Sequence, residues 1–292
     1  MSCATDSIPR ESLAALCGTL SAVHKESLPP QTDLLDLAAR FAHLPGTVLL
    51  ASGGDLDCAR FHILGALPWL TLEGRPDRVR ISCDEHAWSG KANPFDVLQT
   101  CLERLRLPAD LGAAPLAAGL LGYLAYDLKD CLEDLPRTSL DELGLPSMLF
   151  YAPSILVVQD RKAGDTRLLI PERNGDPRQI EQIQQRFRKM AGSPPPEAGA
   201  WQTGEGQPSS NFSRPEYERT VGQVIDYIAA GDVYQVNLSQ KFATPFSGDG
   251  FALFRHLFHN NPAPFFAYIN AGDHQIVSTS PERFLLRDGE RV

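Results

Sequence analysis

Apolar residues recur with a helical period at several places in the first two thirds of the chain. Their spacing predicts helices over 34–41, 94–105 and 180–190. Asp176 and Pro177 precede the last of these stretches and supply an N-cap and a first-turn proline. This part of the chain is therefore expected to contain several amphipathic helices.

Short apolar runs bounded by turn residues indicate strands in the same region. One such run covers 48–50 and is followed by turn residues at 52–55. Two others, at 149–159 and 167–170, flank Gly164 and predict a hairpin. Helices and strands are thus mixed along the chain, which is typical of an α/β or α+β protein.

The stretch 191–213 has the composition of a linker. It contains consecutive prolines at 194–196, four glycines and several serines, with Trp201 and Phe212 as its only aromatic residues. We therefore expect a first subdomain over 20–190, a linker over 191–213 and a second domain that begins at 214 and is incomplete at 292.

A helix with signals at both ends follows the linker. Ser213 and Glu216 match a capping box, and Gly231 stands where a left-handed C-terminal cap belongs. The apolar stripe between these signals consists of Tyr217, Val221, Val224, Ile225 and Ile228. We expect a helix from Arg214 to Ala230.

Apolar and polar residues alternate over 234–242, which predicts a strand with one apolar and one polar face. The polar face carries amide and hydroxyl groups, which suit either a solvated sheet or a ligand-lined cavity; the pattern alone favours the solvated sheet. A helix over 251–258 and strands near 264–270 and 275–279 are predicted next. The sheet is therefore expected to continue.

Composition excludes several classes of partner. The chain has 292 residues, of which 43% are hydrophobic and 22% charged, so it is long enough for one large or two medium globular domains. Its formal net charge of −9 makes nucleic acid and anionic membranes unsuitable partners. No apolar run approaches the roughly 20 residues of a spanning helix, and we expect a cytoplasmic protein.

The cysteines indicate free thiols in a reducing compartment. No Cys-x-x-Cys pair is present, and a chain of this size does not need disulfides to fold. The six positions are Cys3, Cys17, Cys58, Cys83, Cys101 and Cys131.

General catalytic motifs are scarce. The chain lacks a Gly-x-Ser-x-Gly elbow, a phosphate-binding loop and a dinucleotide fingerprint. His256 and His259 are three apart on a predicted helix, but no third ligand is suggested nearby, so a structural role is favoured and no metal is expected on this chain. Glu282 follows an apolar strand; it suits a general acid if burial raises its pKa, or a salt bridge with a neighbouring arginine.

Two segments, 231–242 and 280–286, resemble the chorismate-utilising enzymes, the family of anthranilate synthase, isochorismate synthase and component I of aminodeoxychorismate synthase. Two sequence motifs are most similar to the aminodeoxychorismate synthase branch: Tyr-Gln-Val-Asn-Leu-Ser-Gln at 234–240 and Ser-Pro-Glu-Arg-Phe at 280–284. Upstream similarity at 49–52, 60–61 and 119–127 extends the resemblance over nearly the whole chain. It implies an α+β fold of packed β-sheets flanked by helices, with two subdomains and the C-terminal part missing.

The resemblance implies an amination of chorismate at C4, giving 4-amino-4-deoxychorismate for folate synthesis, with ammonia supplied by a glutaminase subunit. Hydroxide is a poor leaving group, so an acid must protonate it, and Glu282 matches the family's proton donor. The family's nucleophilic lysine, in a Pro-Ile-Lys-Gly-Thr motif, and its Mg²⁺ ligands are expected beyond Val292. We therefore expect the isolated chain to be an inactive fragment.

The family also has a tryptophan pocket at the junction of its subdomains. The hydroxyl of Ser52 suits an amino-acid headgroup, and Phe265 suits a wall for the indole. Cys58, Ala59 and Phe266 depart from the expected residues in ways that could fill the pocket, so core and turn roles remain the alternative. The matching positions are Ser52, Cys58, Ala59, Arg60, Phe61, Pro264, Phe265 and Phe266.

Three further interpretations remain open. Anthranilate synthase component I is the sibling activity, and the family distinguishes the two by lysine or alanine in the motif expected after Val292. A non-catalytic tryptophan-binding or partner-docking module belongs to a different class. An incompletely folded fragment with exposed strand edges is the third. If the remaining strands of the sheet lie after Val292, an apolar face of the sheet is left uncovered in this chain.

Overall fold

The computed structural model describes residues 18–107, 116–136, 141–173, 177–197, 199–287 and 291. The chain divides into two compact units, one formed by Met1–Glu197 with Phe254–Val292 and the other by Ala198–Leu253. Asp176, the predicted N-cap, and the cysteines at 3 and 17 lie outside the described residues. The four cysteines inside them are free thiols, as predicted.

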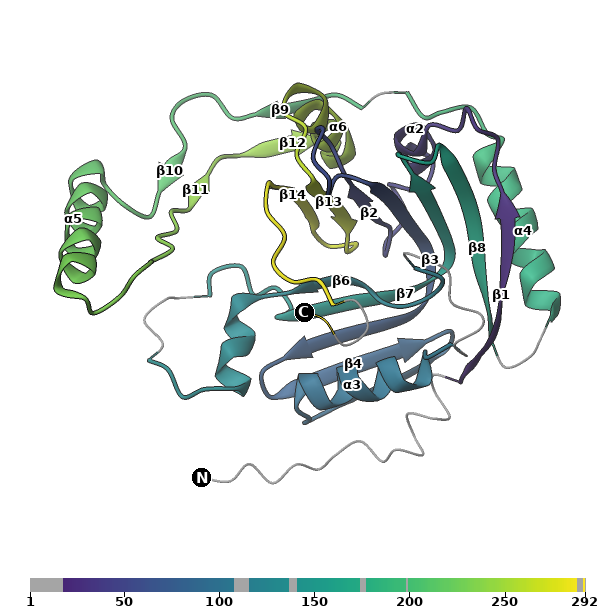
Figure 1. The fold of residues 1–292 in the computed structure, drawn as a ribbon, viewed down its shortest axis with the longest axis horizontal. Helices are drawn as coiled ribbons and strands as arrows, with labels where there is room; N and C mark the ends of the chain where they lie inside the picture. The colour runs from purple at the N-terminus through teal and green to yellow at the C-terminus, as the bar shows by residue number, and fades with distance from the viewer. Residues whose placement is uncertain are drawn as a thin grey trace. The chain divides into compact units, whose positions relative to one another are not determined.

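The first unit is built on a ten-stranded sheet (Figure 1). Its strands are β1 (Leu20–Ser27), β2 (Val48–Ala51), β3 (Phe61–Arg75), β4 (Arg78–Cys83), β5 (His86–Gly90), β6 (Leu121–Leu124), β7 (Met148–Asp160), β8 (Asp165–Arg173), β13 (Phe265–Asn270) and β14 (Gln275–Ser280). Its helical elements are α2 (Leu34–Ala39), α3 (Pro94–Arg104), the 3₁₀ helix η2 (Tyr126–Cys131), α4 (Pro177–Ala191) and the end of α6 (Gly250–Asn260).

The main path of the sheet runs β1-β8-β7-β3-β2-β13-β14, and its neighbouring strands are antiparallel. The strand β13 comes from the C-terminal part of the sequence but pairs with β2, with Phe266 opposite Ala51. Residues 254–292 therefore share a unit with the N-terminal part of the chain. This differs from the predicted division, which placed them in a second domain beginning at residue 214.

The sheet bends where β3 and β7 both contain proline. Their register shifts between Pro68 and Leu70 on β3, opposite Pro153 and Ala152 on β7. On one side of the shift β3 pairs with β2, and on the other it pairs with β4. Proline cannot donate to the ladder, so the interruption falls where hydrogen bonding is already broken. Figure 1 shows β3 and β7 curving through this point.

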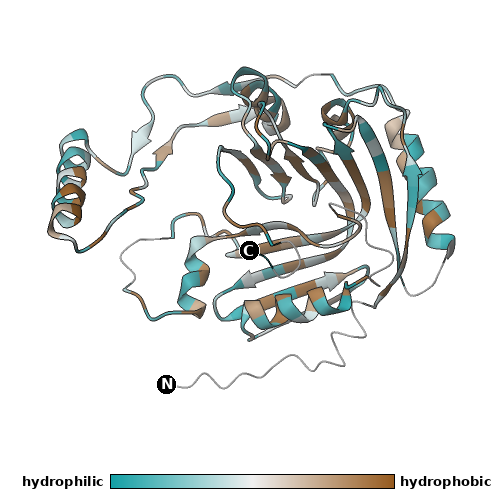
Figure 2. Cartoon of the chain, viewed as in Figure 1, coloured by the Kyte–Doolittle hydropathy of each residue, from teal (hydrophilic) through white to brown (hydrophobic). Residues whose placement is uncertain are grey.

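Two apolar cores are built on the sheet, and the second contains residues from both sides of the bend. One core includes Trp69, Leu72 and Met148 together with Val97 and Cys101 of α3. The other is formed by strand residues alone and includes Val48, Leu121, Tyr151, Leu156 and Ile269. Figure 2 shows the hydrophobic residues concentrated on the strands, while α3 and α4 also carry hydrophilic residues. The resulting α+β architecture, with helices on a large antiparallel sheet, agrees with the predicted fold class.

Most predicted elements are present in the first unit. The helices expected over 34–41, 94–105 and 180–190 are α2, α3 and α4, and the predicted hairpin is β7–β8. The helix expected over 251–258 is α6, and the last two predicted strands are β13 and β14. These elements have clear local signals, such as the Asn93 side chain that accepts from Phe95 N at 2.9 Å before α3.

The second unit contains α5 (Arg214–Ala230) and two short strand pairs. The strands are β9 (Trp201–Thr203) with β12 (Phe246–Gly248) and β10 (Ser209–Ser210) with β11 (Phe242–Ala243). Both β9 and β10 lie in the stretch predicted to be a linker. The capping box between Ser213 and Glu216 is present, and Gly231 adopts φ 82, so α5 has the predicted bounds.

The predicted apolar stripe of α5 is not covered. No residue of this helix is buried, and Ile225 is 60% exposed. Figure 2 shows the hydrophobic residues along the helix. The local cap signals are therefore sufficient to define α5 without tertiary burial of its apolar face.

The strand predicted over 234–242 is wrong except at its end. Residues 234–241 form no strand, Tyr234 is 93% exposed, and regular pairing begins only at Phe242 in β11. A strand needs a hydrogen-bonded neighbour, and alternation of side chains cannot supply one. Next to β11, hydrogen bonds link Gln240 to Ser210 and Lys241 to Asn211.

Candidate functional site

The three stretches proposed for an amino-acid pocket meet at the end of β2. This strand lies between β3 and β13, with Leu50 opposite Ile63 on one side and Ala51 opposite Phe266 on the other. Extending the β2–β13 register by one residue and the β2–β3 register by two places Ser52 between Phe265 and Phe61. The sheet therefore brings together positions that are more than 200 residues apart in the sequence.

The backbone of Ser52 is fixed by both neighbouring segments. Its N–H donates to Nδ1 of His62 at 3.1 Å, and the next N–H, of Gly53, donates to the carbonyl of Ala263 at 2.9 Å. A Cβ on Gly53 would lie 2.5 Å from Cβ of Pro262, so only glycine allows this approach. The Ser52 side chain is buried, and its hydroxyl makes no hydrogen bond with another described residue.

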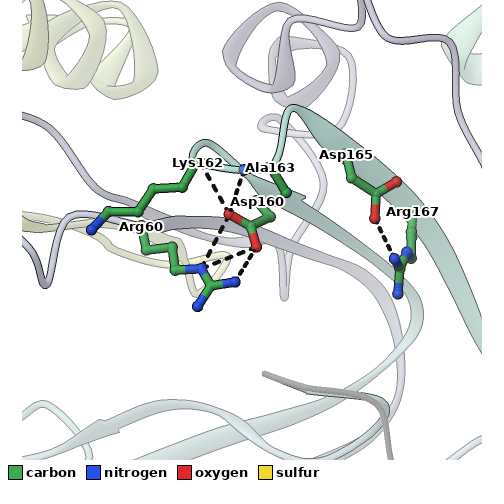
Figure 3. Close-up of polar contacts among 6 residues, drawn as sticks. All are labelled: Arg60, Asp160, Lys162, Ala163, Asp165 and Arg167. Carbon is green, nitrogen blue, oxygen red and sulfur yellow. Dashed lines mark hydrogen bonds and ion pairs between the residues drawn. The ribbon is translucent and has the colours of Figure 1, made fainter.

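Arg60 is held by an ion pair rather than directed at a ligand. Its Nη2 lies 2.6 Å from Oδ2 of Asp160, and the backbone N–H groups of Lys162 and Ala163 donate to the same carboxylate (Figure 3). These hydrogen bonds, that of Arg60 first, lower the pKa of Asp160, and the carboxylate in turn raises the pKa of Arg60. The guanidinium also lies 4.7 Å from the centre of the Phe61 ring.

Cys58 and Ala59 form the turn that leads into β3. Cys58 is a half-buried thiol, whereas Ala59 is only 4% exposed. The carbonyl of Ala59 accepts from Nη1 of Arg161 at 2.8 Å, which ties this turn to the β7–β8 hairpin. Both residues have structural contacts of the kind expected for core and turn positions.

Phe266 belongs to an aromatic cluster with α6. Its ring centre lies 6.0 Å from that of Phe254 and 5.2 Å from that of Phe258, both edge to face. Pro264 is buried, and Phe265 is half-buried at the start of β13. Phe265 therefore remains the more accessible of the two rings, as a wall for a ligand requires.

His62 was not singled out by the sequence, although it is central to this site. It is 8% exposed, its ring lies 6.1 Å from that of Phe258, and its Nδ1 accepts from Ser52. Burial first, and the nearby Arg161 second, lower its pKa to about 4. The imidazole is therefore neutral at pH 7, and its role as an acceptor places the proton on Nε2.

Glu282 lies in an exposed segment just after β14. The hydroxyl of Ser280 donates to the carbonyl of Glu282 at 3.1 Å. The backbone N–H of Glu282 in turn donates to the Ser280 hydroxyl oxygen at 3.4 Å. Among the described residues its carboxylate has no ion pair, and the adjacent Arg283 instead lies 5.3 Å from the centre of the Phe265 ring. The carboxylate is thus exposed and open to a ligand.

The described part of the chain offers no metal centre, since it contains no group of three or more His, Cys, Asp or Glu side chains able to hold an ion. His256 instead pairs with Nδ2 of Asn260 at 3.0 Å. A search of the described helices for one long and apolar enough to cross a membrane finds none.

Comparison with known proteins identifies relatives over most of the chain. Anthranilate synthase component 1 of Cereibacter sphaeroides is 33% identical over 256 residues, covering 82% of this chain and 51% of the relative. Aminodeoxychorismate synthase component 1 of Escherichia coli is 33% identical over 258 residues, covering 87% and 54% respectively. The chain therefore spans about half the length of these curated relatives.

The fold agrees with a solved structure of the same group. Anthranilate synthase component I from Streptococcus pneumoniae superposes with a TM-score of 0.62 at 22% identity, covering 79% of this chain and 52% of that one. A family model described as chorismate binding enzyme matches residues 68–292. Since that match includes most of the chain, the protein belongs to the chorismate binding enzyme family.

Proposed function

We propose that this chain is part of an enzyme that aminates chorismate at C4, component I of an aminodeoxychorismate synthase. The observation that carries the proposal is the segment Ser280-Pro281-Glu282-Arg283-Phe284, which leaves β14 with the carboxylate of Glu282 exposed and unpaired among the described residues. The family match through this segment and the relatives of that name support it.

In this proposal Glu282 protonates the departing C4 hydroxyl. A carboxylic acid does so efficiently only when its pKa approaches the working pH, which requires removal of water from around it. Glu282 is exposed in the chain by itself. The desolvation must therefore come from bound substrate or from protein that closes over the end of β14.

Ammonia is proposed to come from a glutaminase partner, and Mg²⁺ to act in the complete enzyme. The donor set of the described residues does not fit such an ion, because no group of three suitable side chains is present. No step on this chain is therefore assigned to the metal.

A second candidate is anthranilate synthase component I. It is favoured by the relatives of that name, which reach the same identity as the aminodeoxychorismate synthases. The two activities consume the same substrate and differ in the position of the amino group and in the loss of pyruvate, so product analysis separates them.

The test is an assay of the polypeptide encoded by the whole reading frame that contains this chain, given chorismate, ammonium and Mg²⁺. We expect chromatography to show 4-amino-4-deoxychorismate as the product. Accumulation of anthranilate would replace the leading proposal with the second, and unchanged chorismate would exclude both.

Tryptophan binding at the end of β2 is proposed as a structural or regulatory function of the same protein. It is supported by the unbonded hydroxyl of Ser52 and by the position of Phe265 beside it. Calorimetric titration of the chain with L-tryptophan tests it: saturable binding of one equivalent is expected, and heats equal to dilution would contradict it.

A further inference from the structure

A cavity of about 560 Å³ lies at the bend of β3, against α4. Its volume is in the range of small-molecule sites. Glu282 and the eight residues of the proposed tryptophan pocket are not among the residues that line it. The cavity is therefore a separate site from both.

The backbone is strained at one wall of this cavity. Leu67, which lines it, has φ 52, in the left-handed region that leucine rarely adopts. Asp84, another lining residue, has φ 49, but it opens the two-residue loop of the β4–β5 hairpin, where positive φ is normal. Leu67 lies instead directly before the register shift of β3, where a bulge bends the strand. Strain of this kind costs of order 1–3 kcal/mol and is concentrated at functional sites.

Three polar side chains line the cavity without internal partners. Gln182 and Arg186 are four residues apart on α4 and so share one face of the helix, and Ser154 lies on β7. None of the three makes a hydrogen bond or ion pair with another described residue. Together they offer amide, guanidinium and hydroxyl donors, a set that suits the oxygens of a carboxylate.

The charge around the cavity is positive. The carboxylate of Asp84 is paired with Nη1 of Arg173 at 2.8 Å. The Arg173 guanidinium also lies 4.8 Å from the centre of the Trp69 ring, which forms part of the wall. Asp84 is thus neutralised, and among the described residues no carboxylate pairs with Arg186. An anion is favoured over a cation.

We propose that this cavity binds a small carboxylate with an apolar body. Arg186, Gln182 and Ser154 hold the carboxylate. Leu67, Pro68, Trp69 and Ile183 surround the body of the ligand. The proposal is independent of the amination reaction, because it uses none of the residues assigned to that reaction.

The test is a calorimetric titration of the full 292-residue chain with benzoate, which combines a carboxylate with a compact apolar ring. Saturable binding with a dissociation constant below about 5 mM is expected for a ligand of this size. Benzyl alcohol, which keeps the ring and lacks the charge, is expected to bind at least about tenfold more weakly. Absence of saturable benzoate binding, or equal binding of the alcohol, would overturn the proposal.

Variants locate the binding. Arg186→Gln is expected to weaken benzoate binding at least about tenfold. Gln182→Glu, which places a carboxylate beside Arg186, is expected to weaken it similarly. Both residues are exposed, so a thermal melt of each variant should match the parent. The control is Lys189→Gln, which removes a positive charge from α4 outside the cavity and should leave binding unchanged. Equal loss in the control, or full binding in both cavity variants, would contradict the assignment.

Discussion

The backbone N–H of Ser52 donates to Nδ1 of His62 at 3.1 Å, and this bond joins the end of β2 to β3 inside the first unit. Because Nδ1 is the acceptor, the bond requires a neutral imidazole with its proton on Nε2; an imidazolium carries a proton on both nitrogens and cannot accept. His62 is 8% exposed, so protonation would place an unpaired charge in the interior as well as remove the acceptor.

Stability is expected to fall with acid through His62. The folded pKa of about 4 lies below the unfolded value of 6.5, so the contribution is complete above pH 6.5 and is lost as pH falls from 6.5 to about 4. The difference in pKa corresponds to at most about 3 kcal/mol. Urea unfolding of the parent and of His62→Gln between pH 7.5 and 4 measures it, since this range runs from about one unit above the window to its lower end. A parallel pH dependence in both proteins would contradict this role.

Two glycines should respond in opposite directions to alanine. A Cβ on Gly122 of β6 would lie 1.9 Å from the carbonyl oxygen of Leu149, a backbone atom that cannot move aside. Gly122→Ala is therefore expected to destabilise the chain by about 3 kcal/mol or more. Gly222, inside α5, has no atom within 4 Å of its Cβ position, and Gly222→Ala should stabilise α5 by about 0.5–1 kcal/mol.

Thermal unfolding monitored by circular dichroism measures the effect of Gly122→Ala on stability. The loss of the helical circular dichroism signal on heating measures the effect of Gly222→Ala on α5. An unchanged melting temperature for Gly122→Ala would show that β6 does not pack on β7 as described.

The proposed amino-acid pocket predicts unequal contributions from Ser52 and Arg60. The Ser52 hydroxyl makes no hydrogen bond with another described residue, so it is free to bind the ligand. Ser52→Ala removes this hydroxyl and should lower the affinity for tryptophan about tenfold. Arg60→Gln should change it less than about threefold, because its guanidinium is engaged by Asp160. Calorimetry of both variants measures the ratio, and a larger loss for Arg60→Gln would reverse the assignment.

Hydrogen exchange should separate two neighbouring parts of the C-terminal sequence. Residues 234–241 form no regular pairing and should exchange quickly, whereas β13 lies between β2 and β14 and should be protected. Protection in β13 would oppose the interpretation of the chain as an incompletely folded fragment. Exchange of Tyr268 and Ile269 as fast as that of 234–241 would support it.

Local signals in the sequence account for the elements that were predicted. The helix α5 has a capping box at Ser213 and a left-handed Gly231, so its bounds follow from its own residues. The strand expected over 234–242 depends instead on a partner, and alternation alone does not specify one. The pairing of β13 with β2 has the same non-local character, which is why the predicted boundary at 214 divided one sheet.

The candidate site was only partly accessible to sequence reasoning. The resemblance identified Ser52, Phe265 and Glu282, and the sheet brings the first two together. It gave no signal for His62, because a single histidine in a strand resembles any half-buried position. The ion pair between Arg60 and Asp160 links residues 100 apart and likewise depends on the fold.

The central claim is that Glu282 is the acid of a chorismate-utilising enzyme. Its most direct test is the amination rate of the whole polypeptide that contains this chain, with Glu282→Gln compared with the exposed control Glu85→Gln. We expect Glu282→Gln to lower kcat by about 10²–10⁴-fold with intact folding, and the control to retain full activity. Undiminished turnover in Glu282→Gln would contradict the claim.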